Sequence, residues 1–127
     1  MQEASSWIAI VDDDPSVLKA LSRALHFRGL RAKTYRSAQE FLATLPEGLP
    51  QCLIVDLQMP EMTGLELHDD LRRRGVQIRT IMITAHGDRR TQDRSEAAGI
   101  SAFLSKPLRK TALFEAIDKL TGRVVDD

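Results

Sequence analysis

The stretch "WIAIVDDDPSVLKALSRALHFRG", residues 7–29, joins a short apolar run to an amphipathic helical pattern through three consecutive carboxylates. The run Trp7–Val11 is apolar and partly β-branched, which predicts a buried strand. Asp14 is suited to cap a helix that begins at Pro15, and Gly29 is suited to end it. A strand that leads directly into a helix is the repeating unit of α/β folds.

The same unit recurs along the chain. Four more short apolar runs follow at similar intervals, over residues 31–35, 52–56, 79–84 and 101–105. A helical pattern follows each of these four runs. The four patterns extend from Ser37 to about Leu45, onward from Gly64, over residues 88–98 and from about Lys110 to Leu120. Because neighbouring parallel strands need crossover connections, five such units predict an α/β layer structure around a parallel sheet.

Size and composition indicate one domain. The chain has 127 residues and a mass of 14.2 kDa, and we expect residues 1–127 to form a single domain with a core over about 7–120. It carries no apolar run near the ~20 residues that span a bilayer and no pattern of a secretory signal, so we expect a cytoplasmic protein without membrane contact. Its formal net charge is zero, whereas nucleic-acid-binding domains carry a basic excess, so direct nucleic-acid binding is not expected.

Chemistry-bearing residues follow the predicted strands. Asp12 and Asp13 come after the first strand, Asp56 ends the third, Thr84 ends the fourth and Lys106 follows the fifth. In parallel α/β sheets, ligands bind beyond the carboxyl ends of the strands, so these groups are expected to converge. Carboxylates held together repel one another unless a cation compensates them. Hard oxygen ligands without a Cys/His cluster favour Mg²⁺ over Zn²⁺.

This set of groups suits phosphoryl transfer. A carboxylate beside Mg²⁺ can attack phosphorus, and the metal and Lys106 would neutralise the charge on the transferring oxygens, while Thr84 could donate a hydrogen bond to one of them. Read singly, acidic residues at strand ends often serve only as helix caps, as we expect for Asp14. It is the convergence of all five groups that predicts a phosphoryl-transfer site.

Four motifs carry a resemblance to a known family. They are "VDDD" (11–14), "VDLQMPEMTG" (55–64), "ITAHGD" (83–88) and "FLSKPL" (103–108). From about Trp7 to Leu120 the chain resembles the receiver domain of two-component response regulators. The residues of these motifs are most like those of the FixJ-type receivers. The resemblance implies a flavodoxin-like, doubly wound (βα)5 fold with a five-stranded parallel sheet in the order 2-1-3-4-5.

The resemblance also implies a role for each acidic position. Asp56 would be the phosphoacceptor. Asp13 would hold Mg²⁺ directly and Asp12 through water, with Asp56 and the backbone carbonyl of Gln58 as further ligands. In the loop after Asp56, Gly64 is expected to permit a tight turn.

On the opposite side of the site, Thr84 would be the switch hydroxyl and Lys106 the phosphate-contacting ammonium. Phe103 stands where the family places an aromatic rotamer switch, and a cis Lys106–Pro107 bond would turn the lysine into the cleft. Gln58 and His86 lie two residues past Asp56 and Thr84, where side chains can modulate hydrolysis. His86 could act as a general base, although a lone histidine is more often an exposed loop residue.

As a receiver, the protein would not be a conventional enzyme, although it would catalyse its own phosphorylation and dephosphorylation. The donor would be a sensor histidine kinase or a phosphotransfer protein. Phosphorylation would switch a face made of the fourth helix, fifth strand and fifth helix, which would control an effector domain or output protein. The protein would be a monomer or a phosphorylation-dependent dimer.

The fourth helical segment departs from the others because it contains no Leu, Ile, Val, Met or aromatic residue. Since few buried contacts imply low local stability, we hypothesise that residues 88–98 are mobile or partly unwound before phosphorylation. The alternative is a regular helix held by Ala97 and Ala98.

Three other functions compete with this interpretation. A Mg²⁺-dependent aspartyl-phosphate hydrolase would want a second carboxylate at position 58, which is Gln, and a cap domain. A flavodoxin-like cofactor binder would want phosphate-binding amides where this chain is acidic. A degenerate receiver that only binds proteins would lack some of the chemical groups. The sequence leaves open whether the chain is a free-standing receiver or is cut from a longer DNA-binding regulator.

Overall fold

The computed structural model describes residues 7–85 and 89–122. The strands are β1 (Trp7–Val11), β2 (Arg31–Tyr35), β3 (Cys52–Asp56), β4 (Arg79–Thr84) and β5 (Ala102–Ser105). The helices are α1 (Pro15–Phe27), α2 (Ala38–Ala43), the 3-10 turn η1 (Leu45–Glu47), α3 (Gly64–Arg73), α4 (Arg89–Ala97) and α5 (Lys110–Thr121).

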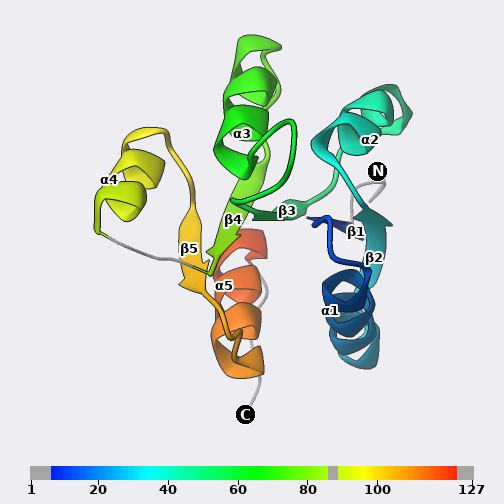
Figure 1. Ribbon diagram of the computed structural model, residues 1–127. Coiled ribbons are helices and arrows are strands. Elements are labelled where there is room, and N and C mark those ends of the chain that lie inside the picture. The colour runs from blue at the N-terminus through cyan, green and yellow to red at the C-terminus, as the bar shows by residue number, and fades with distance from the viewer. Residues whose placement is uncertain (1–6, 86–88, 123–127) are drawn as a thin grey trace.

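The strands form one parallel sheet in the order β2-β1-β3-β4-β5 (Figure 1). The fold class and the strand order implied by the resemblance are therefore confirmed. The bounds of the first four predicted strands are correct, and β5 begins one residue later than predicted. The second helix ends two residues early, at Ala43, where the Thr44 hydroxyl donates to the Phe41 carbonyl at 2.8 Å and the chain tightens into η1.

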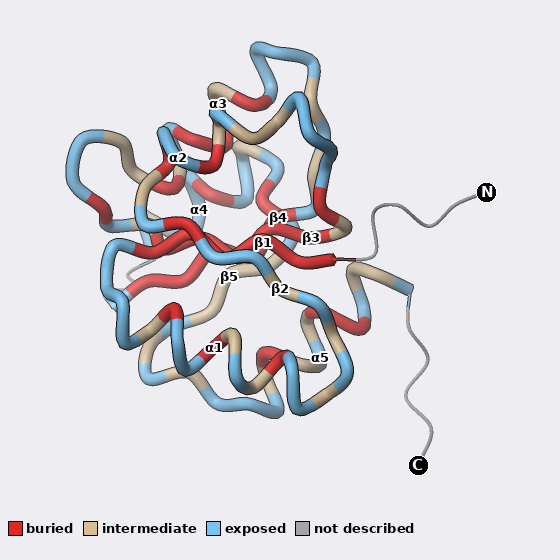
Figure 2. Tube along the Cα trace, turned by 90° about the vertical axis from the view of Figure 1, so that its right-hand side faces the viewer, coloured by how far each residue is buried: buried red, intermediate tan, exposed pale blue. Residues whose placement is uncertain are grey.

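Helices cover both faces of the sheet (Figure 2). Helices α1 and α5 pack on one face, and α2, α3 and α4 lie on the other. Each face has its own apolar cluster, and the central strands β1 and β3 contribute to both because all of their residues are buried. Continuous apolar runs are typical of such doubly covered parallel strands.

Helix α1 is fixed at both ends. At its start, the Asp14 carboxylate accepts hydrogen bonds from the backbone N–H of Ser16 at 3.0 Å and from the Ser16 hydroxyl at 2.7 Å, which confirms Asp14 as the cap. Beyond its end, the Arg28 guanidinium pairs with the buried Asp118 of α5 at 2.8 Å and lies over the Phe114 ring at 4.5 Å. The end of α1 is thus joined to α5.

The fourth helical segment forms helix α4, Arg89–Ala97, and its only buried residue is Ser95. Residues 89–97 thus form a regular helix in this structure, but Ala97, one of the two alanines expected to hold it, is exposed; residue 88 lies outside the described residues. The low stability expected for this helix stays a prediction. Within the described ranges, no helix is both long enough and apolar enough to cross a membrane.

Candidate functional site

The register of the sheet gathers the candidate residues at the carboxyl ends of the strands. Val11 pairs with Val55, so the next residues, Asp12 and Asp56, lie side by side. Asp56 pairs with Ile83, which places Thr84 one residue beyond it, and Thr84 pairs with Ser105, which is followed by Lys106. Carboxylate oxygens of Asp12, Asp13 and Asp56 all lie within 4.8 Å of one another.

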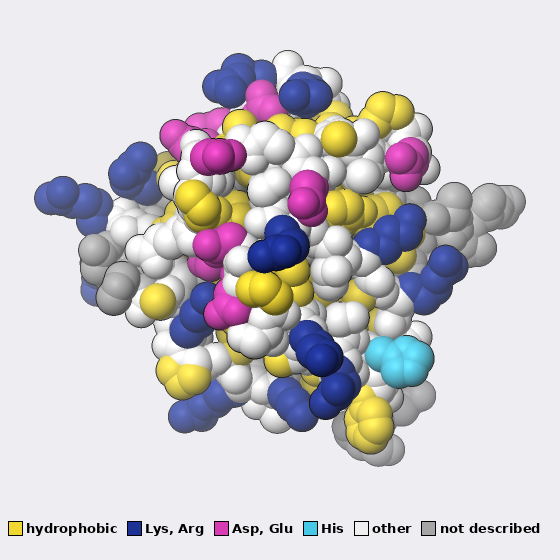
Figure 3. Space-filling view, turned by 45° about the vertical axis from the view of Figure 1, so that its right-hand side comes forward, with side chains coloured by type: hydrophobic (Ala, Val, Ile, Leu, Met, Phe, Trp, Pro, Cys, Tyr) yellow, Lys and Arg dark blue, Asp and Glu magenta, His cyan; other side chains and the backbone are white. Residues whose placement is uncertain are grey.

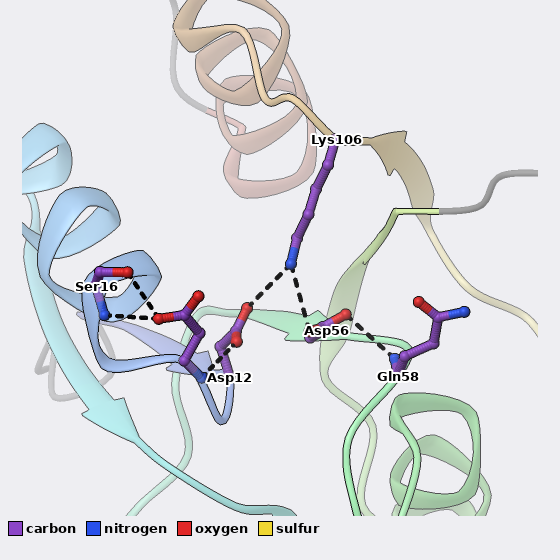
Figure 4. Close-up of polar contacts among 6 residues, drawn as sticks. Asp12, Ser16, Asp56, Gln58 and Lys106 are labelled. Carbon is purple, nitrogen blue, oxygen red and sulfur yellow. Dashed lines mark hydrogen bonds and ion pairs between the residues drawn. The ribbon is translucent and has the colours of Figure 1, made fainter.

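Lys106 reaches both buried carboxylates (Figure 4). Its Nζ atom lies 3.5 Å from Oδ2 of Asp56 and 3.8 Å from Oδ2 of Asp12. The Lys106 backbone N–H donates to the Thr84 carbonyl at 2.8 Å, which fixes the lysine beside the end of β4. The Lys106–Pro107 bond is cis, as the resemblance implies.

Two backbone amides orient the carboxylates. Oδ1 of Asp12 accepts from the Asp14 N–H at 2.9 Å, and Oδ1 of Asp56 accepts from the Gln58 N–H at 3.1 Å (Figure 4). Each contact is a short turn in which the carboxylate bonds to the backbone two residues on, as Asp commonly does. The donor in each contact is a backbone N–H that any residue except proline supplies, so the sequence alone does not show which of the three carboxylates makes such a turn.

The electrostatics of the site centre on Asp12. Burial raises its pKa to about 6; the hydrogen bond from the Asp14 N–H opposes this rise, and the negative charge of Asp56 adds to it. Among the described residues, no group donates a hydrogen bond to the buried Oδ2 atom of Asp12. A buried carboxylate oxygen with this environment favours a nearby cation.

The residues expected to switch the protein or to modulate hydrolysis differ in how far they are buried. Thr84 is fully buried, and Phe103 is half-buried against the apolar cluster on the α3 side of the sheet. The Gln58 side chain is exposed. His86 lies outside the described residues.

The loop between β3 and α3 is constrained by close packing. A Cβ atom at Gly64 would lie 2.6 Å from the Asp56 carbonyl oxygen and 2.7 Å from Met82 Sδ. Its φ angle is not positive, so the reason for glycine here is the close approach to Asp56 rather than the tight turn predicted from the sequence. The Gly64 N–H also donates to the Leu57 carbonyl at 2.9 Å, which holds the start of α3 against the phosphoacceptor candidate.

The sequence model described as "Response regulator receiver domain" matches residues 8–118. The chain belongs to this family. The receiver domain is 42% identical over 117 residues to "Response regulator protein TmoT" of Ectopseudomonas mendocina, an alignment that covers 92% of this chain and 53% of the relative. It is 36% identical over 118 residues to "Transcriptional regulatory protein FixJ" of Rhizobium meliloti, which covers 93% of this chain and 58% of FixJ.

Solved structures agree with this assignment. The receiver superimposes on the crystal structure of FixJ-N with a TM-score of 0.86 and 36% identity, covering 99% of both chains. The receiver spans about half the length of the curated relatives it matches. It is therefore a receiver domain of the kind found in two-component response regulators, and the geometry of Asp56 is consistent with a phosphoacceptor role.

Proposed function

We propose that Asp56 accepts a phosphoryl group from a histidine kinase, or from a phosphotransfer protein, in a Mg²⁺-dependent reaction. The observation that carries this proposal is the grouping of Asp12, Asp13 and Asp56 within 4.8 Å, with the Lys106 ammonium 3.5 Å from Asp56. Among the described residues, these three carboxylates have only the Lys106 ammonium as a cationic partner, which leaves excess negative charge at the end of the sheet. A divalent cation would balance that charge and prepare the site for an incoming phosphoryl group.

The residues fit Mg²⁺. Asp13 would bind it directly, Asp12 through water, and Asp56 and the Gln58 carbonyl would complete the protein ligands. The buried Oδ2 of Asp12, which accepts no hydrogen bond from the described residues, supports a cation at this point. When bound, Mg²⁺ would neutralise negative charge on the phosphoryl oxygens.

The chain's own groups would perform the rest of the transfer. A carboxylate oxygen of Asp56 would attack phosphorus, the bond from phosphorus to the donor imidazole would break, and the electron pair would stay on the imidazole nitrogen. Lys106 would exchange its contact with Asp56 for one with a transferring oxygen, and the Thr84 hydroxyl would donate to another. Hydrolysis of the acyl phosphate would later reset the site, at a rate modulated by Gln58 and His86.

The phosphoryl group would also switch the protein. By drawing the buried Thr84 hydroxyl towards it, phosphorylation would open space for Phe103 and shift the face formed by α4, β5 and α5. We propose one receiver domain over residues 1–127, with its core over about 7–120, that acts in the cytoplasm on an effector domain or output protein. It would be a monomer or a dimer formed on phosphorylation.

Intact-mass measurement after incubation with acetyl phosphate and Mg²⁺ tests the proposal. We expect the wild-type protein to gain one phosphoryl group and Asp56→Asn to gain none. Asp14→Asn is the matched control, because Asp14 caps α1 and should leave the reaction intact. A degenerate receiver would gain no phosphoryl group in any variant.

Mg²⁺ titration at several pH values tests the metal site separately. Because protons and Mg²⁺ would compete for the Asp12 site, whose metal-free pKa is about 6, the apparent affinity should fall as the pH drops below about 6 and level off above it. Asp13→Ala should abolish binding, and Asp12→Asn should weaken it and flatten the pH dependence. Binding that survives in Asp13→Ala would contradict the proposed ligand set.

A further inference from the structure

A groove runs between the outer side of α1 and the end of strand β2. It has a volume of about 600 Å³ and is lined by a stripe of α1 from Pro15 to His26 and by Thr34 and Arg36. The lining residues of α1 recur at three- and four-residue intervals, which places them on one side of the helix. At 1.5 Å per residue the stripe is about 16 Å long, the span of about five residues of extended chain.

The groove carries uncompensated positive charge. Its lining includes Lys19, Arg23, His26 and Arg36 but no carboxylate. Within the described part of the chain, none of these four side chains forms an ion pair. The surrounding sequence, residues 15–39, contains no Asp or Glu.

Figure 3 shows the same asymmetry on the surface. Lys and Arg side chains gather over the lower part of this face, where α1 and β2 lie, and most of the Asp and Glu side chains in view lie above them. The carboxylates that flank residues 15–39 in the sequence are already engaged: Asp14 with Ser16, and Glu40 with the backbone N–H of Arg36 at 2.9 Å. The charge is therefore local, although the whole chain is formally neutral.

Two further features adjoin the groove. Among the described strands, β2 is an edge strand that pairs with β1 alone, so its outer edge faces no strand from residues 7–85 or 89–122. At the far end of the stripe, Phe27 follows His26 and is 92% exposed. Basic residues on an edge strand also discourage aggregation, but that role does not explain Lys19 and Arg23, because they belong to α1.

We propose that this groove binds an extended acidic segment of a partner protein. The carboxylates of the segment would contact Lys19, Arg23 and Arg36, its backbone would pair with the open edge of β2, and an apolar residue at one end would cover Phe27. A five-residue acidic stretch matches both the length and the sign of charge of the groove. The surface lies on the outer side of α1 and needs none of the groups at Asp56, so it does not depend on the proposed phosphorylation.

Other polyanions fit the groove less well. Specific DNA contacts spread over a broad basic surface of roughly 1,000 Å² or more, whereas here four basic groups line a single shallow groove whose lining also includes the apolar Pro15 and Leu18. An anionic membrane would need an apolar stripe along the helix, and the outer side of α1 offers only Phe27 at its end.

Binding of a synthetic probe to the unphosphorylated protein tests the proposal. The probe is a short peptide that alternates Glu with Val and ends on Phe, and the control peptide carries Gln in place of Glu. We expect the acidic peptide to bind and to shift backbone NMR signals of α1 and β2, and the Gln peptide to bind at least about tenfold more weakly. Affinity should fall with added salt, as the Debye length shortens from ~30 Å at 0.01 M to ~8 Å at 0.15 M.

Charge-reversal variants locate the binding site. K19E/R23E should weaken binding of the acidic peptide at least about tenfold, because attraction becomes repulsion. The matched control is R94E/K119E, which reverses two exposed charges on α4 and α5 and should bind as the wild type does. F27A should weaken binding less than K19E/R23E.

Several outcomes would overturn the proposal. They are equal binding of the Glu and Gln peptides, unchanged binding in K19E/R23E, or NMR shifts confined to other elements. A short DNA duplex and vesicles containing phosphatidylglycerol are run in parallel. If either of these binds through Lys19 and Arg23 while the acidic peptide does not, the groove is a nucleic-acid or membrane contact and the proposed protein partner is wrong.

Discussion

Helices α3 and α4 each follow a strand that ends in a site residue, yet they are anchored very differently. Helix α3 buries Gly64, Leu67, His68 and Leu71, whereas α4 buries only Ser95. At the start of α3, a capping box joins Thr63 and Glu66 through two reciprocal hydrogen bonds of 2.9 and 3.1 Å. The phosphoacceptor candidate therefore stands before a helix with four buried residues, and Thr84 stands before a helix with only one.

This difference assigns separate tasks to the two sides of the site. A reactive group must keep its geometry. The packing of α3 against the segment of Asp56 holds that residue in place. The proposed switch would need an element with a small energy difference between its arrangements, and we expect a helix with one small buried side chain to meet that condition. The contrast between α3 and α4 can be tested directly.

The largest expected effect is on α3. Leu67 is fully buried, so Leu67→Ala should lower the free energy of unfolding by about 2–5 kcal/mol. Ser95→Ala on α4 should change it by less than about 1 kcal/mol, since it removes a buried hydroxyl that has no hydrogen-bond partner among the described residues. Urea unfolding measures both, and a loss in Ser95→Ala as large as in Leu67→Ala would break the comparison.

The next effect concerns the contact between α3 and Asp56. Gly64→Ala would place a methyl group against the Asp56 carbonyl and Met82, which should cost about 1–3 kcal/mol and displace the site. Phosphorylation by acetyl phosphate should slow in parallel. Unchanged stability together with an unchanged rate would show that the loop adapts freely, contrary to the firm anchoring inferred for α3.

Amide hydrogen exchange compares the helices without mutation. We expect amides in the middle of α4 to exchange at least about tenfold faster than those in the middle of α3, because α4 can open without exposing a large apolar surface. The mid-helix amides of α1, which buries Leu18, Leu21 and Leu25, provide the reference. Protection in α4 equal to that in α1 would remove the basis for a loosely held helix.

The smallest expected effect is at the capping box. Thr63→Ala removes the hydroxyl that accepts from the Glu66 N–H at 3.1 Å and should cost about 1 kcal/mol. Thr63→Ser keeps the acceptor and should recover most of this loss in thermal unfolding. If both variants were equally destabilised, the side-chain cap would not explain the stability of the start of α3.

The sequence predicted most of the fold because its local signals agree with one another. Apolar runs with β-branched residues located all five strands, and the rule that ligands bind at strand ends led to Asp12, Asp13 and Asp56. Helix starts were predictable where a side chain caps them, as Asp14 does.

Features that depend on packing between distant segments were not predictable. Asp118 looked like an ordinary polar position, but it is buried and pairs with Arg28, ninety residues away in the chain. His68 is buried on α3 beside Gly99, with a ring carbon 3.9 Å from the place of a Cβ atom there, and burial lowers its pKa. Helical spacing places both residues on the buried sides of their helices, but a polar side chain at such a position argues against burial until the partner from another part of the chain is known.

The chain's single cysteine has a practical consequence for observing the switch. Cys52 is fully buried in β3, and burial raises the pKa of its thiol to about 12, so the reactive thiolate is scarce at neutral pH. Cysteines introduced at exposed positions of α4 and α5 can therefore be labelled with spin or fluorescent probes while Cys52 is left in place. Distances between such labels, compared with and without phosphorylation, would test the proposed shift of α4 in the otherwise unaltered protein.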